Sequence, residues 1–334
     1  MEEAKISILI PAKNERDYLS ACLNSVIDQD FSSWEIILID DHSSDNTFEI
    51  AQQFAIRDSR IRCFKNTGEG IISALKMALA LSKGSLITRM DADDLMRPSK
   101  LSTLSSLLEE AGRGHIAVGG VHYFSADKVK SGFRQYEKWL NSRTAEGTNF
   151  QDIFRECAIP SPNWMLFRED LIKIGAFDHA IYPEDYDLAF RMYLGGLAVI
   201  PCNEVTLEWR DYPSRTSRTA EVYKDHTFTA IKWSYFDRFF RQSARQLVLF
   251  GTGYRGKRLA AHLIERDVPF VWVSNNPEKI GKHIYDIMID PLNSFDWHQK
   301  QIIATIANDR GRQEVTEMAK NNGLRLNIDL FHFA

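Results

Sequence analysis

The sequence predicts an α/β fold in which helices cover a mostly parallel central sheet, followed by a second, smaller α/β domain. Three observations lead to this prediction. Short apolar runs alternate with stretches of helical spacing from residue 6 to residue 90, as they do in parallel sheets covered by helices. A new strand, turn and helix pattern starts at Gln246, so we expect domains at 1–243 and 244–334. The length of 334 residues also suits about two domains.

The expected elements follow one another along the chain. In the first domain, strands are expected at 6–10, 35–39, 61–64 and 85–90, and helices at 18–26, 47–54 and 70–81. Further on, helices are expected at 95–108, 188–194 and 223–241, a strand at 195–201, and no clear pattern at 119–161. In the second domain, strands are expected at 246–250 and 270–274, and a continuing α/β sheet from residue 301. Ligands bind at the carboxyl ends of parallel strands, so the residues after these strands are the first candidates for a site.

Composition and charge exclude several classes of protein. Hydrophobic residues make up 44% and charged residues 26% of the chain, which is typical of a globular protein and not of a disordered chain or a fibre. The net charge of −4 predicts no nucleic-acid partner. Four scattered cysteines without a CxxC pair indicate reduced thiols, and neither a signal peptide nor an apolar run of about 20 residues is found. We expect a cytoplasmic protein, and attachment to the inner face of the plasma membrane stays open.

A cluster of acidic residues follows the fourth expected strand. Asp91, Asp93 and Asp94 come directly after Met90. Alternating residues at a strand end can aim two carboxylates at one point, which suits a hard divalent cation such as Mg²⁺ or Mn²⁺. A helix start is the alternative, because Asp94 could cap a helix over 95–108.

Two further acidic pairs lie at a strand end and at a helix start. Asp40 and Asp41 end the second expected strand, where a carboxylate can accept a hydrogen bond from a base or a ribose, or form an Asx-turn. Glu184 and Asp185 precede the helix expected at 188–194 and could cap it. Together, the three acidic places predict a site for a metal, a nucleotide and a base.

Several ordered motifs over residues 4–220 resemble those of family 2 glycosyltransferases, which have the GT-A fold. Ile8–Glu15 resembles the opening strand and nucleotide-binding turn, and Ile39–Asp45 resembles the uridine-contacting motif, with His42 where Gly is usual. The later matching segments are Asn66–Lys83 before the fourth strand, Met90–Asp94 as the DxD metal motif, and Lys173–Asp178 with Glu184–Leu188 on the acceptor side. Arg210–Pro213 resembles an Arg-x-His-Pro loop in which Tyr212 replaces the His.

The resemblance implies an inverting, metal-dependent transfer of a sugar from a nucleoside diphosphate sugar, expected to be a UDP-sugar, to a hydroxyl of a saccharide or glycolipid. It implies that Asp93 and Asp91 hold Mn²⁺ or Mg²⁺. Asp185 would be the catalytic base, with Glu184 as the second candidate. The expected nucleotide-binding residues are Pro11, Ala12, Asn14, Glu15, Asp41, Asp91, Ala92, Asp93, Arg215 and Arg218. The family setting is bacterial surface polysaccharide or glycolipid assembly, and a nucleotide-sugar-binding protein without turnover is the non-enzymatic alternative.

The second domain carries a glycine-rich turn. Gly251, Gly253 and Gly256 have the spacing of a dinucleotide-binding turn between a strand and a helix. A phosphate loop is one interpretation, and an NAD(P)-dependent oxidoreductase is the alternative function. No acidic residue ends the strand at 270–274, which disfavours NAD. The domain resembles Rossmann-like modules of some sugar-modifying enzymes, and acceptor recognition, assembly into a homo-oligomer and scaffolding all stay open.

Aromatic and basic residues are mixed over residues 231–241. An amphipathic helix of this composition can lie on a membrane surface. A helix at a domain junction that packs its aromatic side chains against protein is the alternative, and we favour it because aromatic stripes are most often part of a core.

Overall fold

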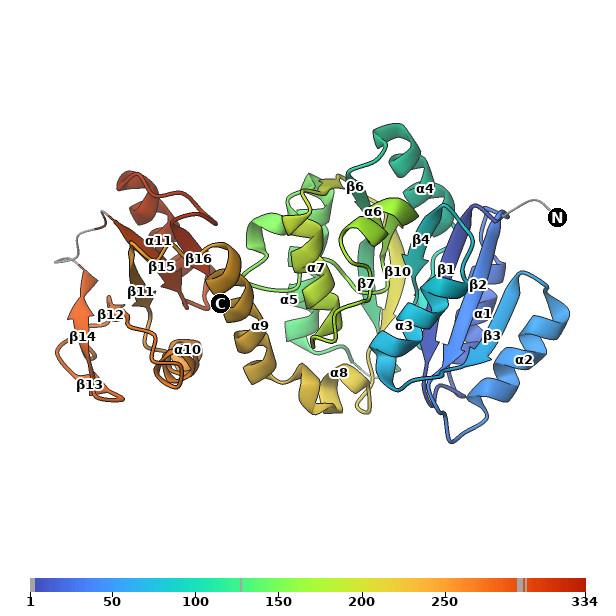
Figure 1. Ribbon diagram of the computed structural model, residues 1–334, viewed down its shortest axis with the longest axis horizontal. Helices are drawn as coiled ribbons and strands as arrows, with labels where there is room; N and C mark the ends of the chain where they lie inside the picture. Colours follow the sequence, from blue (N-terminus) through green and yellow to red (C-terminus); the bar gives the residue numbers. More distant parts are fainter. Residues whose placement is uncertain (1–3, 127, 293–296, 298) are drawn as a thin grey trace. The chain divides into compact units, whose positions relative to one another are not determined.

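The structure, a computed structural model, describes residues 4–334 with the exception of residues 127, 293–296 and 298. The chain folds into two compact units (Figure 1). The first unit comprises Met1–Phe150 and Ala158–Thr219, and the second comprises Gln151–Cys157 and Ala220–Ala334. The division thus falls at Thr219 and not at residue 243, where the sequence places the boundary. The reason is α9 (Asp225–Phe239), whose buried Phe236 packs against Phe154 and Phe331 of the second unit.

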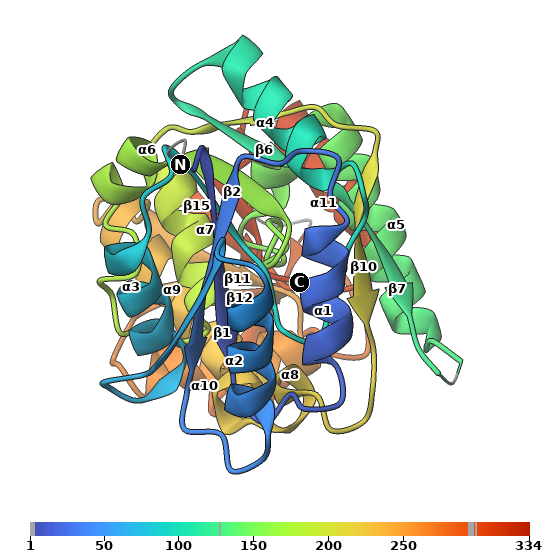
Figure 2. The same cartoon turned by 90° about the vertical axis from the view of Figure 1, so that its right-hand side faces the viewer.

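The first unit opens with the alternation of strands and helices that the sequence predicts. The elements are β1 (Ile6–Ala12), α1 (Leu19–Ile27), β2 (Trp34–Asp40), α2 (Thr47–Arg57), β3 (Ile61–Lys65), α3 (Gly70–Leu81) and β4 (Leu86–Arg89). These strands are parallel and lie in the order β3-β2-β1-β4. Every residue of β2 is buried, as expected for a parallel strand covered on both faces. Figure 2 shows α1 and α3 on opposite sides of β1 and β2.

The rest of the first unit extends this sheet and adds a smaller one. The main sheet continues with β8 (Trp164–Phe167), β6 (His115–Val118) and β9 (Ala198–Ile200), and β8 is antiparallel to both of its neighbours. The small sheet has the order β5 (Leu95–Met96), β10 (Val205–Arg210) and β7 (Gly120–Phe124). The helices here are α4 (Lys100–Ala111), α5 (Ser131–Glu146), α6 (Arg168–Lys173), α7 (Glu184–Leu194) and α8 (Thr216–Thr219). The 3-10 helix η1 (Asn149–Asp152) spans the point where the chain first passes into the second unit, and the 3-10 helix η2 (Glu221–Tyr223) belongs to the second unit.

Two expectations for this part of the chain are wrong. Leu95 and Met96 pair with β10 as a strand, so the helix expected at 95–108 begins only at Lys100, after Pro98. Asp94 therefore caps no helix. The region 119–161 holds β7 and α5, although no clear pattern is expected there. Leu140 and Thr144 of α5 are buried, and its partly buried aromatic side chains Phe133, Tyr136 and Trp139 pack against the core. Phe133, Tyr136 and Leu140 have helical spacing, which is the signal that the sequence prediction missed.

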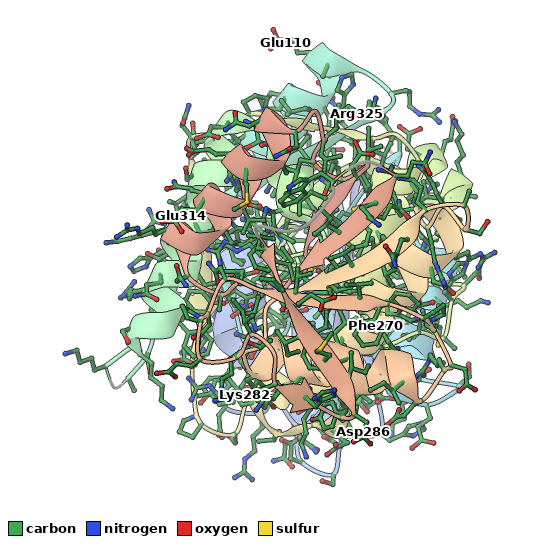
Figure 3. The ribbon with its side chains drawn as sticks, turned by 90° about the vertical axis from the view of Figure 1, so that its left-hand side faces the viewer. Glu110, Phe270, Lys282, Asp286, Glu314 and Arg325 are labelled. Carbon is green, nitrogen blue, oxygen red and sulfur yellow. The ribbon has the colours of Figure 1, made fainter. Side chains whose placement is uncertain are left out.

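The second unit is built on a six-stranded sheet, which confirms the predicted Rossmann-like module. The strands lie in the order β13 (His283–Ile284), β14 (Ile287–Pro291), β12 (Val271–Ser274), β11 (Gln246–Phe250), β15 (Lys300–Ala304) and β16 (Leu330–His332). All neighbours are parallel except β13 and β14. α10 (Tyr254–Ile264) follows β11, and α11 (Asp309–Asn321) follows β15. In Figure 3, which faces this unit, the labelled Lys282, Asp286, Glu314 and Arg325 are exposed.

Aromatic side chains of α9 belong to the core of this unit. Trp233, Tyr235 and Phe236 are buried. This burial supports the packing interpretation of the aromatic stretch over the membrane interpretation. Within the part of the chain that the structure describes, no helix has both the length and the apolar character needed to cross a bilayer.

Candidate active site

The candidate site lies where the strand order of the first unit reverses. The order β3-β2-β1-β4 places the second and fourth strands on opposite sides of β1. Crevices at such points bind ligands outside the carboxyl ends of the strands. Pro11 and Ala12 end β1, whereas Asp91, Ala92 and Asp93 follow β4 after Met90. Two groups of predicted nucleotide-binding residues therefore come from adjacent strand ends.

The turns after β1 and β2 are tied to each other by side chains. The Asn14 backbone N–H donates to Ser43 Oγ at 2.9 Å, and the Ser44 N–H donates to Asn14 Oδ1 at 2.8 Å. Asn14 and His42 both have a φ of 58°. This left-handed backbone explains why the resembling motif usually has Gly at the place of His42. The two turns form one hydrogen-bonded platform beside the strand ends.

Asp41, which follows β2, forms hydrogen bonds to residues at and before the start of α3. Its Oδ1 accepts hydrogen bonds from Asn66 Nδ2 at 2.7 Å and from the Gly70 N–H at 2.9 Å, and its Oδ2 lies 3.3 Å from Lys13 Nζ. Burial alone would raise the pKa of Asp41, but these hydrogen bonds and the Lys13 charge lower it below its usual range. Asp41 is thus held as a carboxylate, and its contact with a nucleotide base stays a prediction.

Asp93 and Asp94 are buried against the segment that follows β10. Tyr212 Oη donates to Asp93 Oδ2 at 3.0 Å, and the Arg210 N–H donates to Asp94 Oδ1 at 2.7 Å. Arg215 lies 3.8 Å from Asp93 Oδ2 and 4.0 Å from Asp94 Oδ2. Burial raises the pKa of both carboxyls, and the Arg215 charge opposes that rise. Tyr212, which replaces the usual His, therefore holds the DxD-like segment directly.

The structure brings Arg215 to the acidic cluster but directs Arg218 elsewhere. Arg218 Nη2 lies 2.5 Å from Asp211 Oδ1, and its guanidinium lies 4.8 Å from the centre of the Phe133 ring. Arg215 is therefore the better placed of the two for a diphosphate near Asp93. The contact of either side chain with a nucleotide stays a prediction.

Glu15 completes the group of carboxylates between β1 and β4. Burial, followed by repulsion from Asp93, Asp91 and Asp45, raises the pKa of Glu15 to about 8. Such repulsion is relieved by a bound cation, and carboxylate oxygens are the ligands that Mg²⁺ and Mn²⁺ prefer. In ligand type, Asp91, Asp93 and Glu15 therefore suit a hard divalent cation. Among the described residues, however, no three His, Cys, Asp or Glu side chains are placed to hold a metal by themselves.

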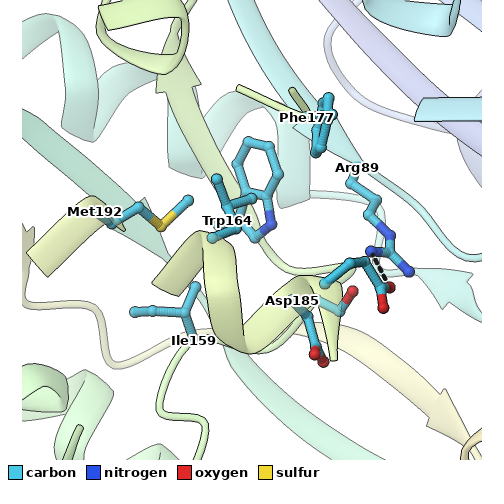
Figure 4. A pocket seen from close by; sticks show the side chains of 9 residues that line it. Arg89, Ile159, Trp164, Phe177, Asp185 and Met192 are labelled. Carbon is cyan, nitrogen blue, oxygen red and sulfur yellow. Dashed lines mark hydrogen bonds and ion pairs between the residues drawn. The ribbon is translucent and has the colours of Figure 1, made fainter. Parts of the chain in front are cut away.

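Asp185 and Glu184 begin α7 and line a small cavity of about 10 Å³ next to Arg89 and Trp164 (Figure 4). Asp185 Oδ1 accepts a hydrogen bond from the Tyr186 N–H at 2.8 Å. Burial raises the pKa of Asp185 to about 7, and repulsion from Glu184 adds to the rise, whereas the Arg89 charge opposes it. A carboxyl with such a pKa can accept a proton near neutral pH.

Arg89 joins the two acidic groups and is the residue that sequence reasoning missed. Its Nε donates to Asp91 Oδ1 at 2.8 Å, and its Nη1 donates to Glu184 Oε1 at 3.1 Å (Figure 4 shows the second contact). Arg89 is 5% exposed. A charged residue within a strand that has no other charge was the available signal, since buried charges need partners. The bridge connects the end of β4 to the start of α7.

The glycine-rich turn of the second unit is explained by close packing. A Cβ on Gly256 would lie 2.1 Å from Gly251 O and 2.8 Å from Thr305 Oγ1. Gly251 has a φ of +112°, whereas the space around Gly253 is open. β12 ends at Ser274 and is followed by Asn275 and Asn276, so no carboxylate stands where NAD would need one. No contact in this turn favours the oxidoreductase alternative, and the phosphate loop stays a prediction.

Comparison with known proteins identifies the family. The model of Glycosyl transferase family 2 matches residues 7–175, which is half of the chain. Glycosyltransferase GlyG of Streptococcus pneumoniae is 26% identical over 224 residues, covering 64% of this chain and 73% of that protein. Glycosyltransferase GlyA of the same organism is 28% identical over 220 residues, covering 64% of this chain and 32% of its own length. The chain thus spans most of one relative and about a third of the other.

Solved structures share the fold. S. aureus TarS residues 1–349 in complex with UDP-GlcNAc is 16% identical, with a TM-score of 0.55 over 78% of this chain and 71% of that chain. The mannosyltransferase PcManGT from Pyrobaculum calidifontis in complex with GDP-Man and Mn²⁺ is 19% identical, with a TM-score of 0.53 over 70% of this chain and 65% of that chain. At such identities the likeness concerns the fold alone, which is of the predicted GT-A type. The family model, which matches half of the chain, shows that the chain belongs to glycosyl transferase family 2 and is a glycosyltransferase.

Proposed function

We propose that the first unit transfers a sugar, with inversion, from a nucleoside diphosphate sugar to an acceptor hydroxyl. The donor is proposed to be a UDP-sugar and the acceptor a saccharide or glycolipid of a bacterial cell surface. The observation that carries the proposal is the bridge by Arg89 between Asp91, at the proposed donor site, and Glu184, next to Asp185. Two structural neighbours hold UDP-GlcNAc and GDP-Man, which supports a nucleotide-sugar donor.

In the proposed reaction Asp185 accepts the proton of the acceptor hydroxyl. The acceptor oxygen then forms a bond to the anomeric carbon of the sugar while the bond from that carbon to the diphosphate breaks. Attack on the face opposite the leaving group inverts the configuration at this carbon. Because the pKa of Asp185 is about 7, its carboxylate is a suitable base near neutral pH. Glu184 is engaged by Arg89 and is proposed to hold the pair in place.

The residues proposed to hold a divalent cation are Asp93 and Asp91, with Glu15 beside them. Mn²⁺ or Mg²⁺ at this place would neutralise the charge that develops on the leaving diphosphate. Arg215, which lies 3.8 Å from Asp93, adds a fixed positive charge on the same side. In the described part of the chain, the acidic cluster and Arg215 thus form the proposed diphosphate site.

The test compares Asp185→Asn with the wild-type chain. Release of nucleoside diphosphate is measured with UDP-sugars and GDP-sugars, Mn²⁺ and a panel of saccharide acceptors. Loss of the base lowers the rate by about 10²–10⁴-fold, while donor binding, followed by thermal shift, is retained. Asp237→Asn is the matched control, because Asp237 forms an exposed ion pair with Arg241 in the second unit, away from the residues proposed for the reaction.

Three outcomes would contradict the proposal. Full activity of Asp185→Asn would exclude Asp185 as the base. Tight donor binding by the wild-type chain without product would support the non-catalytic alternative. Retention of configuration in the product, read from the anomeric proton coupling, would exclude the inverting mechanism.

A further inference from the structure

A second cavity lies entirely within the second unit. Its volume is about 130 Å³, and its walls come from α9, α10, the segment after β15 and the chain around Glu156 and Phe333. A cavity needs roughly 10–15 Å³ to admit a single water, so this one has room for several. A cavity of this size is larger than packing defects in protein interiors, which rarely exceed one water. The proposed transferase reaction makes no use of it.

The cavity lies where the strand order of the second sheet reverses. β12 and β15 flank β11 on opposite sides, so the reversal falls between β11 and β15. Tyr254 and Arg255 follow β11 at the start of α10, and Thr305 follows β15 directly. All three residues line the cavity. It therefore lies at the position where open α/β sheets bind ligands.

Three cationic side chains and one carboxylate line this cavity. Lys232 is buried, and its Nζ donates to Arg155 O at 2.6 Å and to Phe333 O at 3.2 Å, which fixes the charge in the wall. Arg258 Nη1 donates to Tyr254 Oη at 2.8 Å. Arg255 lines the cavity, is exposed, and forms no hydrogen bond or ion pair with the described residues. The lining thus has a net positive charge, opposed only by Glu156.

We propose that this cavity binds a phosphorylated sugar, either as a free sugar phosphate or as the sugar phosphate part of a nucleotide. Arg255 and Arg258 match a phosphate, because guanidinium groups donate paired, charge-assisted hydrogen bonds to its oxygens. Glu156 can accept hydrogen bonds from sugar hydroxyls, and Tyr254 and Phe333 offer aromatic surface to the ring. A whole dinucleotide is disfavoured, because β12 ends without a carboxylate.

The test measures binding to the full chain by isothermal titration calorimetry. The probes are glucose 1-phosphate, adenosine 5′-monophosphate, inorganic phosphate and unphosphorylated glucose. At least one of the two phosphate esters is expected to bind more tightly than inorganic phosphate, and glucose is expected not to bind. The ester that binds distinguishes a free sugar phosphate from a nucleotide. Affinity should also fall as salt rises, because the contacts are charged.

A pair of variants locates the binding. The double variant Arg255→Ala, Arg258→Ala is expected to weaken ester binding by about tenfold or more, since it removes charge-assisted hydrogen bonds. Arg266→Ala is the matched control, because Arg266 follows the same helix but does not line the cavity. Arg255 and Arg266 are exposed, whereas Arg258 is half-buried, so the unfolding temperature of each variant is measured to confirm that the fold is kept.

Several results would overturn the inference. They are the absence of ester binding to the wild-type chain, equal affinity of the double variant and Arg266→Ala, and inorganic phosphate binding as tightly as either ester. Equal affinity in both variants would assign the binding to another place, such as the proposed donor site. The inference stands apart from the transferase proposal, because a chain without transferase activity can still bind these probes.

Discussion

The two units share a strand order but carry opposite charges where that order reverses. The first unit has β3-β2-β1-β4 and the second has β14-β12-β11-β15, so each first strand lies between the second and the fourth. Glu15, Asp91 and Asp93 follow β1 and β4, whereas Arg255 and Thr305 follow β11 and β15. The same sheet geometry therefore presents carboxylates in one unit and a cationic wall in the other.

This difference indicates that the strand order determines where a site lies, whereas the residues that follow the strands determine its chemistry. In the first unit the carboxylates repel one another, and the pKa of Glu15 is raised to about 8, first by burial and then by this repulsion. A cation relieves such a cluster. In the second unit the guanidinium groups keep their charge at all physiological pH values and suit an anion.

The largest effect on stability is expected from Arg89→Met. This change leaves Asp91 and the buried Glu184 without their shared cation. Breaking a buried pair by removing one partner typically costs about 3–5 kcal/mol of unfolding free energy. Urea denaturation measures this loss, and the transferase rate should fall as well, because the bridge positions both acidic groups.

Arg97→Met is the control for this prediction. Arg97 pairs with Glu208, but its side chain is 44% exposed. Exposed pairs contribute about 0–1 kcal/mol. If both variants lost the same stability, the bridge would be no more than a surface pair, and the link between the two acidic groups would lose its significance.

Removal of divalent cations is expected to affect the transferase activity of the first unit and to leave the second unit unchanged. A bound cation supplies several kcal/mol of transition-state stabilisation, so chelation should lower the rate of nucleoside diphosphate release by about 10²–10³-fold. Added Mn²⁺ should restore it, and Asp93→Asn should raise the Mn²⁺ concentration needed. Full activity after chelation, with no Mn²⁺ detected by electron paramagnetic resonance, would contradict the metal proposal.

Whether the sequence alone predicts a feature of either site depends on how far apart along the chain the contacting residues are. The positions of Asp91 and Asp93 follow from the apolar strand before them, because the end of a strand is a local feature. The contact of Arg89 with Glu184 spans 95 residues and depends on how α7 packs on the sheet. β5 has only two residues and exists through its pairing with β10, so no local pattern could reveal it.

The cationic cavity of the second unit was hidden for a similar reason. Its cations come from α9 and α10, and Glu156 belongs to a short segment that the chain contributes before it returns to the first unit. The glycine spacing, in contrast, is visible in the sequence. The structure explains Gly251 and Gly256 by close packing with Thr305. A motif can therefore mark the correct turn while its residues serve the fold.

Gly256→Ala and Gly253→Ala form a matched pair for that turn. A Cβ at position 256 would lie 2.1 Å from Gly251 O, so Gly256→Ala should destabilise the chain by about 1–3 kcal/mol through overpacking. Gly253 has open space and a φ of −72°, so Gly253→Ala should leave stability nearly unchanged. Thermal unfolding measures both. Equal losses would show that glycine flexibility, and not close approach, governs the turn.

The smallest expected effect is the pH dependence of the transferase rate, which we assign to Asp185 of the first unit. Asp185 must be a carboxylate to accept a proton, and its pKa is about 7 because of burial and the neighbouring Glu184. The transferase rate at low acceptor concentration should therefore rise about tenfold per pH unit below 7 and level off above it.

The raised pKa of Asp185 also means that the folded chain binds this proton more tightly than the unfolded chain. Its contribution to stability is thus present at low pH and is lost as pH rises from about 4 to about 7.

Glu184→Gln shows whether this pH dependence arises from the pair. The substitution removes the repulsive charge beside Asp185 but keeps the size of the side chain, and it leaves the opposing Arg89 charge in place. The pKa of Asp185 should fall, so the acid limb of the rate profile should move to lower pH. A limb that stays at pH 7 would mean that burial alone sets the pKa. A limb that moves to higher pH would mean that another group is titrating, because removal of a neighbouring negative charge cannot raise the pKa of a carboxyl.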